Sequence, residues 1–198
     1  MTRTSFSRVL FYSILSASCV PWASAQDCDF PPKALLQGER REYRGLYENK
    51  AYGYSVVIPK ELVGYDGKNA FYQTGFGIIT GAEPRSYILV ESQKNSLEFA
   101  TPSEAAARFL KYLAKHGDKV ESSEITESKL GQLKAALLVA TYTCPGSKER
   151  YTEASLVAIS PDKGNLYEVT LYARSDRFED DRAVLGTLTK SWKYLGGS

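Results

Sequence analysis

The amino-acid sequence predicts an α+β fold, in which a largely antiparallel β-sheet is covered by two or more helices. Two observations lead to this prediction. Four strand-like segments follow one another over residues 120–174 with connections of hairpin length, and such connections join antiparallel neighbours. Two amphipathic segments, one on either side of this meander, carry helix-capping residues and need an apolar sheet face to cover.

Strands before the first helix are predicted from alternating apolar residues. Tyrosines and β-branched residues alternate over 51–59, and Pro59 ends the segment. Two further strands are expected at 76–80 and 87–92, on either side of a turn. Residues 43–47 are expected to form a short strand or an arm, and the glycine-containing segment 60–74 is expected to be a loop.

The first helix is predicted from its capping residues. Thr101 suits the N-cap, Pro102 the first helical position and Glu104 the third, and together they form a capping box. Gly117 favours an end to the helix. Its apolar stripe at helical spacing consists of Ala106, Phe109, Leu110 and Leu113.

A second helix is predicted at the C-terminal end of the chain. Asp176 is expected to be its N-cap, with Glu179 at the third helical position. Its predicted apolar face consists of Phe178, Leu185, Leu188 and Trp192.

The meander between the helices has four predicted strands, at 120–129, 133–144, 151–160 and 166–174. The first is polar and is expected at a sheet edge. The second contains Ala135-Ala-Leu-Leu-Val-Ala140, a run typical of a strand buried on both faces. In the turn between the last two strands, Gly164 and Asn165 are the residues expected at positive φ.

These features resemble the Mog1/PsbP-like domains, and the chain looks like a bacterial exported member. The resemblance rests on the strand Tyr52-Gly-Tyr-Ser-Val-Val-Ile-Pro59, the capped helix at Thr101-Pro-Ser-Glu104, the meander, and a last helix ending near Ser191-Trp192. It covers about Tyr47 to Tyr194 and implies a sandwich of sheet and helices. Proteins of that fold include Ran-binding proteins, photosystem II extrinsic subunits, periplasmic lipoproteins and secretion-system adaptors. Most of them bind other proteins, and the family has no shared catalytic residues.

The first 25 residues are predicted to be a secretory signal peptide that is cleaved after Ala25. Arg3 and Arg8 precede a mostly apolar stretch from Val9 to Val20, and Ala23-Ser24-Ala25 offers small residues to a signal peptidase. Twelve helical residues span about 18 Å, which is too short for a hydrocarbon core of roughly 30 Å. We therefore expect a periplasmic or secreted protein. The alternatives are a buried N-terminal helix and a lipoprotein modified at Cys19, although the leucine lies four residues before that cysteine instead of the usual three.

Removal of the signal peptide leaves a chain expected to form an N-terminal arm at 26–42 and a single α+β domain at 43–198. Arg3 and Arg8 are the only two of the 25 basic residues that leave, so 23 basic residues face 23 acidic ones. A formal net charge of zero disfavours nucleic acid and anionic membrane surfaces as partners.

Two cysteines, Cys28 and Cys144, remain in the mature chain. In an oxidising compartment two cysteines in one domain most often form a disulfide bond, and this one would tether the N-terminal arm. The alternative is two free thiols.

Few residues are candidates for chemistry, and no cofactor or metal site is predicted. His116 is the only histidine and is expected to interact with the end of the first helix. Gly75-Phe76-Gly77 lacks the third glycine and the helix of a phosphate-binding loop. Acidic residues 179–181 fit a helix N-terminus. Asp66 is the one acid that we retain as a candidate for hydrolysis.

Aromatic residues are concentrated in the segment that precedes the strand at 76–80. A partner-binding surface is therefore predicted at Tyr65, Asp66, Phe71, Tyr72 and Phe76. The alternative is that these rings fold back over the core as a lid.

The function that this pattern favours is that of an exported, non-enzymatic protein-binding module of the bacterial envelope, either an immunity or inhibitor protein or an assembly factor. Two alternatives remain open. One is a small hydrolase that uses carboxylates including Asp66, and the other is a carrier of a small apolar ligand.

Overall fold

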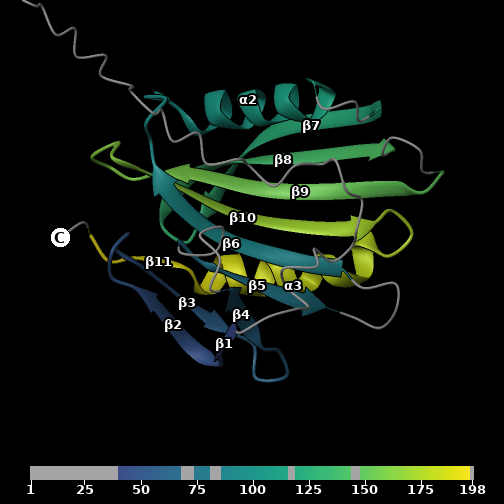
Figure 1. Ribbon diagram of the computed structural model, residues 1–198. Helices are drawn as coiled ribbons and strands as arrows, with labels where there is room; N and C mark the ends of the chain where they lie inside the picture. The colour runs from purple at the N-terminus through teal and green to yellow at the C-terminus, as the bar shows by residue number, and fades with distance from the viewer. Residues whose placement is uncertain (1–39, 68–73, 81–85, 116–118, 144–147, 197–198) are drawn as a thin grey trace, which may run out of the picture.

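An eight-stranded antiparallel sheet forms the centre of the structure (Figure 1). The structure is a computed structural model that describes residues 40–67, 74–80, 86–115, 119–143 and 148–196. The order of the strands in the sheet is β1-β4-β5-β6-β10-β9-β8-β7. Their bounds are Arg40–Tyr43 (β1), Gly64–Gly67 (β4), Phe76–Thr80 (β5), Ser86–Lys94 (β6), Lys119–Leu130 (β7), Leu133–Thr143 (β8), Arg150–Ile159 (β9) and Asn165–Arg174 (β10).

The predicted meander is confirmed as β7 to β10, whose consecutive members are hydrogen-bonded neighbours. The polar strand β7 forms one edge of the sheet, and its exposed charged side chains protect that edge from further pairing. Strand β8 places small and aliphatic side chains on both faces of the sheet, where most are buried. The last strand, β10, also pairs with β6, so the meander continues into the earlier strands.

A second, three-stranded sheet was not predicted. It consists of β11 (Lys193–Tyr194), β3 (Tyr54–Ile58) and β2 (Gly45–Asn49), in that order. The chain passes from the large sheet to the small one between β1 and β2, where Gly45 has a φ of +66°. Glycine adopts this backbone conformation readily, whereas residues with a side chain rarely do. The conformation lets the chain change direction between the two sheets.

The prediction of a loop over 60–74 was wrong in part, because residues 64–67 form β4. This strand pairs with β1 on one side and with β5 on the other. The pairing is supplied by β1, which is distant in the sequence and short, so local patterning did not reveal it.

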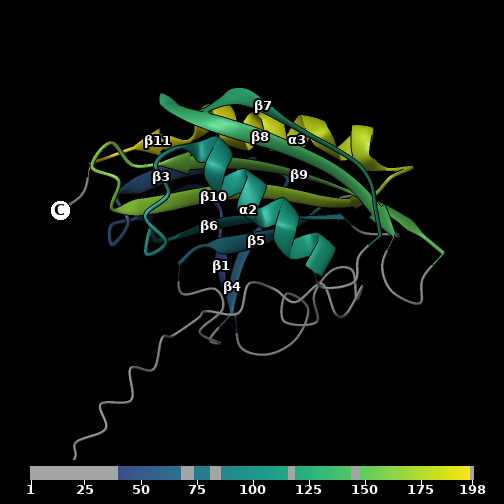
Figure 2. The same cartoon turned by 90° about the horizontal axis from the view of Figure 1, so that it is seen from above.

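The two helices lie on opposite faces of the large sheet, as Figure 2 shows: α2 (Pro102–Lys115) lies on one face, and α3 (Phe178–Ser191) lies on the other beside the small sheet. The predicted N-cap of α2 is confirmed, since the Thr101 hydroxyl accepts the Glu104 amide at 3.2 Å. The Glu104 carboxylate reaches back as in a capping box but accepts the amide of Ala100, one residue before the N-cap, at 2.9 Å. The predicted N-cap of α3 was wrong. Arg177 occupies that position without a side-chain cap, because Arg174 binds the carboxylate of Asp176.

The hydrophobic core is divided by the sheet into two clusters. The α2 side buries the predicted stripe of that helix against β8 and β9. The α3 side contains a continuous run of aromatic rings: Tyr43, Tyr47, Phe76, Tyr54, Trp192, Tyr167 and Tyr194. Many of the tyrosines therefore belong to the core.

Several sequence predictions fall outside the described residues. They are the signal peptide, the disulfide between Cys28 and Cys144, and the roles of His116 and Gly117. Within the described ranges, neither helix is long and apolar enough to cross a membrane.

Candidate functional site

Among the described residues, the predicted partner-binding positions Tyr65, Asp66 and Phe76 do not form one surface. Phe71 and Tyr72 lie outside the described residues. Tyr65 and Asp66 are partly buried and lie on β4. The Asp66 carboxylate accepts hydrogen bonds from the Tyr43 hydroxyl and from the Arg41 amide, the latter at 3.3 Å. Burial and this carboxylate raise the pKa of Tyr43 to about 12. Asp66 therefore joins β1 to β4.

Phe76 was wrongly expected on a binding surface. Its side chain is 0% exposed and lies 4.6 Å from the ring of Tyr47 and 6.4 Å from that of Tyr43, measured between ring centroids. Alternation along β5 directs Phe76 and Ile78 into the core on the α3 side. The structure therefore supports the alternative for Phe76, in which the ring folds over the core.

Sequence reasoning missed a row of three glutamates on the α2 face of the sheet. This glutamate row consists of Glu91 on β6, Glu168 on β10 and Glu153 on β9. Glu91 lies directly opposite Glu168 in the β6–β10 register. The Ser155 hydroxyl contacts Glu168 at 3.0 Å and Glu153 at 3.3 Å, so it lies between the two carboxylates.

Burial of the glutamate row changes its acidity. Glu153 is 0% exposed and Glu168 is 6% exposed. Removal of the partly buried Glu91 carboxyl from water, followed by repulsion from Glu168, raises the pKa of Glu91 to about 8. Burial also raises the pKa of Glu168, although the Thr170 and Ser155 hydroxyls oppose this effect. Glu91 therefore holds a proton through neutral pH.

Carboxyl groups with raised pKa values are common in active sites, but they also occur in structural networks. Here two of the three carboxyl groups are closed off from solvent. The sequence does contain a signal for two members of the row. Glu153 is the only charged residue in Tyr-Thr-Glu-Ala-Ser at 151–155, and Glu168 is the only one in Leu-Tyr-Glu-Val-Thr at 166–170. We assign the row to pH-dependent stability.

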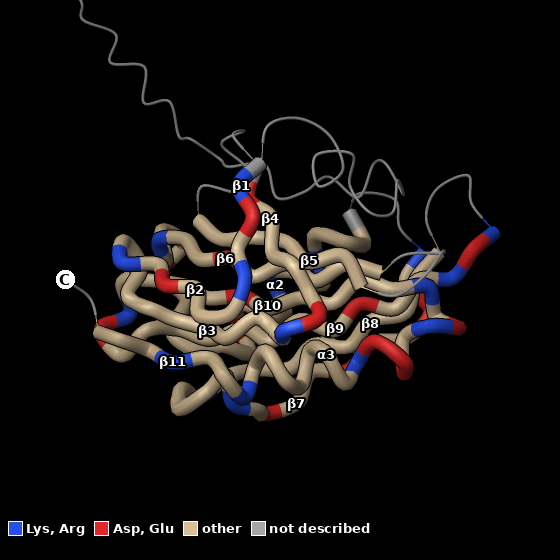
Figure 3. Tube along the Cα trace, turned by 90° about the horizontal axis from the view of Figure 1, so that it is seen from below, with Lys and Arg blue, Asp and Glu red and all other residues tan. Residues whose placement is uncertain are grey.

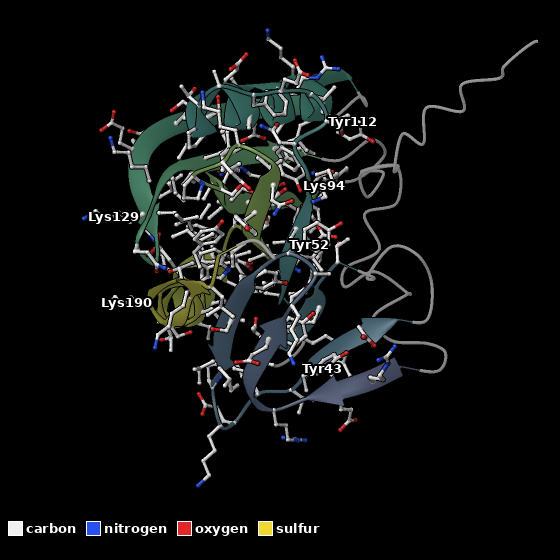
Figure 4. All side chains as sticks on the ribbon, turned by 90° about the vertical axis from the view of Figure 1, so that its left-hand side faces the viewer. Tyr43, Tyr52, Lys94, Tyr112, Lys129 and Lys190 are labelled. Carbon is white, nitrogen blue, oxygen red and sulfur yellow. The ribbon has the colours of Figure 1, made fainter. Side chains whose placement is uncertain are left out.

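A different surface lies at the end of the sheet where the β2–β3, β7–β8 and β9–β10 turns meet, and where α3 ends. We call it the lysine end, and Figure 4 looks onto it. Its carboxylates among the described residues are those of Glu48, Glu98, Glu127 and Asp162. Its exposed lysines are Lys50, Lys94, Lys129, Lys134, Lys163, Lys190 and Lys193.

The lysines of the lysine end are not neutralised by the carboxylates nearby. Within the described part of the chain, none of them forms an ion pair, and Lys129 lies directly opposite Lys134 in the β7–β8 register. Lys94 donates to the side chain of Asn165 at 3.1 Å and lies over the Tyr52 ring. The Asp162 carboxylate accepts from the Ser160 hydroxyl and the Gly164 amide, and these bonds lower its pKa.

At the opposite end of the sheet, basic side chains form ion pairs with acidic ones. Arginines there bind carboxylates: Arg150 binds Glu121 at 2.8 Å, and Arg174 binds Glu149 and Asp176 at 3.2 and 3.1 Å. Basic and acidic residues are interleaved at this end in Figure 3. A chain with nearly equal numbers of basic and acidic residues, 25 and 23, thus has one end with paired charges and one with unpaired cations.

A pocket of about 270 Å³ opens at the lysine end, between the start of α2 and the two hairpin turns. Its apolar lining residues are Ala100, Pro102, Leu133, Ile159 and Pro161. Its polar lining residues are Gln132, Lys134, Ser160 and Lys163. Two exposed leucines, Leu97 at 60% and Leu195 at 52%, lie in the neighbouring segments. The lysine end therefore combines positive charge with exposed apolar surface.

One wall of the pocket is the β9–β10 turn, where the residue at positive φ is Lys163, with a φ of +59°, and not Gly164 or Asn165 as predicted. The Lys163 amide donates to the Ser160 carbonyl at 2.8 Å, and its carbonyl accepts from the Asn95 side chain at 3.1 Å. These bonds hold Lys163 in a conformation that favours glycine or asparagine.

Among the described residues, no group of three or more histidine, cysteine, aspartate or glutamate side chains is arranged to hold a metal ion. The lysine end was also missed by sequence reasoning, since its members come from segments distributed between residues 50 and 193. Only the strand topology brings them together.

Comparison with known proteins identifies the fold. No protein-family model matches the chain, and no curated protein matches it. Solved structures do match. LpqN of Mycobacterium tuberculosis, described as involved in cell envelope biogenesis, is similar with a TM-score of 0.54 and 14% identity over 82% of this chain and 95% of LpqN.

Two further structures are similar over most of their length. Cyanobacterial PsbP from Synechocystis matches with a TM-score of 0.51 and 17% identity, over 78% of this chain and 92% of that protein. The Ran-binding protein Mog1p of Saccharomyces cerevisiae matches with a TM-score of 0.50 and 8% identity, over 79% of this chain and 96% of Mog1p. The chain therefore has the Mog1/PsbP-like α+β sandwich fold, which it shares with LpqN, PsbP and Mog1p.

Proposed function

We propose that the mature chain is an exported, non-enzymatic protein-binding module of the bacterial envelope, and that the lysine end is its binding surface. The observation that carries this proposal is the coexistence of seven exposed lysines without ion pairs and an apolar pocket at one end of the described structure. Unpaired surface cations attract an acidic partner over long distances, and exposed apolar groups provide contact area once it docks.

Three further points support the proposal. The predicted signal peptide and cysteine pair indicate an exported protein. The likeness to LpqN supports a role in the envelope, of which assembly is one form and inhibition of another exported protein a second. The surroundings of two acids also support a non-enzymatic role, since Asp66 bridges two strands and Glu153 is fully buried.

Charge reversal tests the surface. In a variant with Lys129→Glu, Lys163→Glu and Lys193→Glu, capture of the partner by the mature chain from envelope and culture-supernatant extracts is expected to fall by about tenfold or more, because three attractive charges become repulsive. Captured proteins are identified and quantified by mass spectrometry for the wild type and the variant in parallel.

The matched control reverses three exposed charges elsewhere, with Lys60→Glu, Arg108→Glu and Lys111→Glu. It has the same net charge as the lysine-end variant and is expected to retain the partner. Thermal unfolding monitored by circular dichroism confirms that both variants fold. If a folded lysine-end variant captures the same protein as the wild type, the binding surface lies elsewhere.

A further inference from the structure

We infer that the pocket at the lysine end binds the C-terminal residue of a partner protein, with a large aliphatic side chain inside and its free carboxylate on Lys134 and Lys163. This inference rests on the proposed function and names the chemical group that the lysine end would recognise.

The lining of the pocket supports one aliphatic side chain. Five of its nine lining residues are apolar, and its volume of about 270 Å³ is below the range typical of drug-sized ligands. Lys134 and Lys163 belong to the same lining and are exposed, so positive charge meets apolar surface within one small site. An aliphatic side chain and a carboxylate attached to the same Cα atom match this combination.

An internal aspartate or glutamate fits the pocket less well. Its carboxylate is carried at the tip of the side chain, so entry would place the charge against Leu133, Ile159 and Pro161. Burying a carboxylate among apolar groups is unfavourable unless it is paired. A terminal residue instead buries its apolar part and leaves the carboxylate with the lysines.

The backbone at Lys163 is an independent observation. A lysine in the left-handed region is less stable than a glycine there, yet the turn holds it in place with hydrogen bonds to Ser160 and Asn95. Glu98 adopts the same conformation, and what distinguishes Lys163 is that it also lines the pocket. The N-terminus of α2 contributes less to binding the carboxylate. Pro102 has no amide hydrogen, and the Glu104 amide already donates to the Thr101 hydroxyl.

Peptide binding to the mature chain tests the inference. The probes are fluorescein-labelled heptapeptides of glycine and serine that end in leucine with a free carboxylate, in leucine amide, or in serine with a free carboxylate. Fluorescence anisotropy is expected to detect the first, and amidation or replacement of the leucine is expected to weaken binding by about tenfold.

The variant Lys163→Gly separates recognition from folding. It removes the amine and relieves the backbone, so its melting temperature is expected to be unchanged or higher while its affinity for the leucine acid falls by about tenfold. Two controls are expected to bind normally. Lys60→Gln and Lys111→Gln each remove one exposed lysine that belongs neither to the lysine end nor to the pocket lining.

Three results would overturn the inference: equal binding of the amidated peptide, full binding by Lys163→Gly, or no binding of any peptide. The capture experiment described above reports separately on the proposed function. If Lys129→Glu, Lys163→Glu and Lys193→Glu together abolish capture while no peptide binds, the lysine end is the binding surface but does not recognise a chain terminus.

Discussion

Replacing Trp192 with alanine is expected to lower the free energy of unfolding by about 3–5 kcal/mol. Trp192 is 1% exposed and directly follows α3. Its ring stacks on that of Tyr54 with centroids 5.6 Å apart, and it lies 5.0 Å from the ring of Tyr167. The substitution would leave a cavity where α3 and the small sheet meet the large one, and this packing cannot collapse without moving the helix.

The loss should also affect the β7–β8 turn. A Cβ atom on Gly131, whose φ is +56°, would lie 2.1 Å from the Trp192 carbonyl oxygen, so the turn and the end of α3 are in direct contact. Urea unfolding followed by far-UV circular dichroism measures the effect without relying on fluorescence, since Trp192 is the only tryptophan after the predicted signal peptide. The control Leu195→Ala, at an exposed residue, is expected to change the free energy of unfolding by less than about 0.5 kcal/mol. Similar values for the two variants would contradict the packing described for Trp192.

Lowering the pH from 8 to 5 is expected to stabilise the protein by about 2–3 kcal/mol. The folded state keeps a proton on Glu91 up to pH about 8, whereas the unfolded chain releases it near the ordinary value of 4.5. The folded state therefore binds more protons between these values, and stability falls as the pH rises through this window. The raised pKa of Glu168 acts in the same direction. Glu121 and Asp162 have lowered pKa values, so their contributions are lost only at pH values below this window.

The variant Glu91→Gln isolates this effect. An amide of similar shape cannot ionise, so the variant should be more stable than the wild type at pH 8 and should depend less on pH between 5 and 8. The free energy of unfolding is measured by urea titration at each pH. Glu127→Gln, at an exposed position on β7, serves as the control and should keep the wild-type dependence. An unchanged slope in Glu91→Gln would show that other groups set the pH response.

The sequence predicted most elements because they follow local rules. The capping box at Thr101 and Glu104 depends on residues within one helical turn, and the polar pattern of β7 indicates an edge strand without reference to its neighbours. The N-cap of α3 was predicted wrongly because of a contact between neighbouring side chains. Arg174 lies two residues before Asp176 and competes for its carboxylate, a contact that capping rules do not include.

The described residues of the predicted binding loop lie in the sheet and in the core. Tyr65 and Asp66 became part of β4 because β1 pairs with them from a distance of more than twenty residues. Phe76 entered the core because the face of β5 that carries it is covered by the small sheet, which was not predicted. Exposure of an aromatic residue depends on what covers it, and local sequence does not contain that information.

By itself, the sequence determined the class of fold, the boundaries of most strands and helices, and the nearly equal numbers of basic and acidic residues. These follow from periodicity, capping and composition, which are properties of short segments. The tertiary structure decided where the charges lie. It placed seven lysines from segments far apart in the chain at one end, and it aligned Glu91 with Glu168 across a strand pair. The reason is that strand order and register set distances between side chains, and no local pattern encodes either of them.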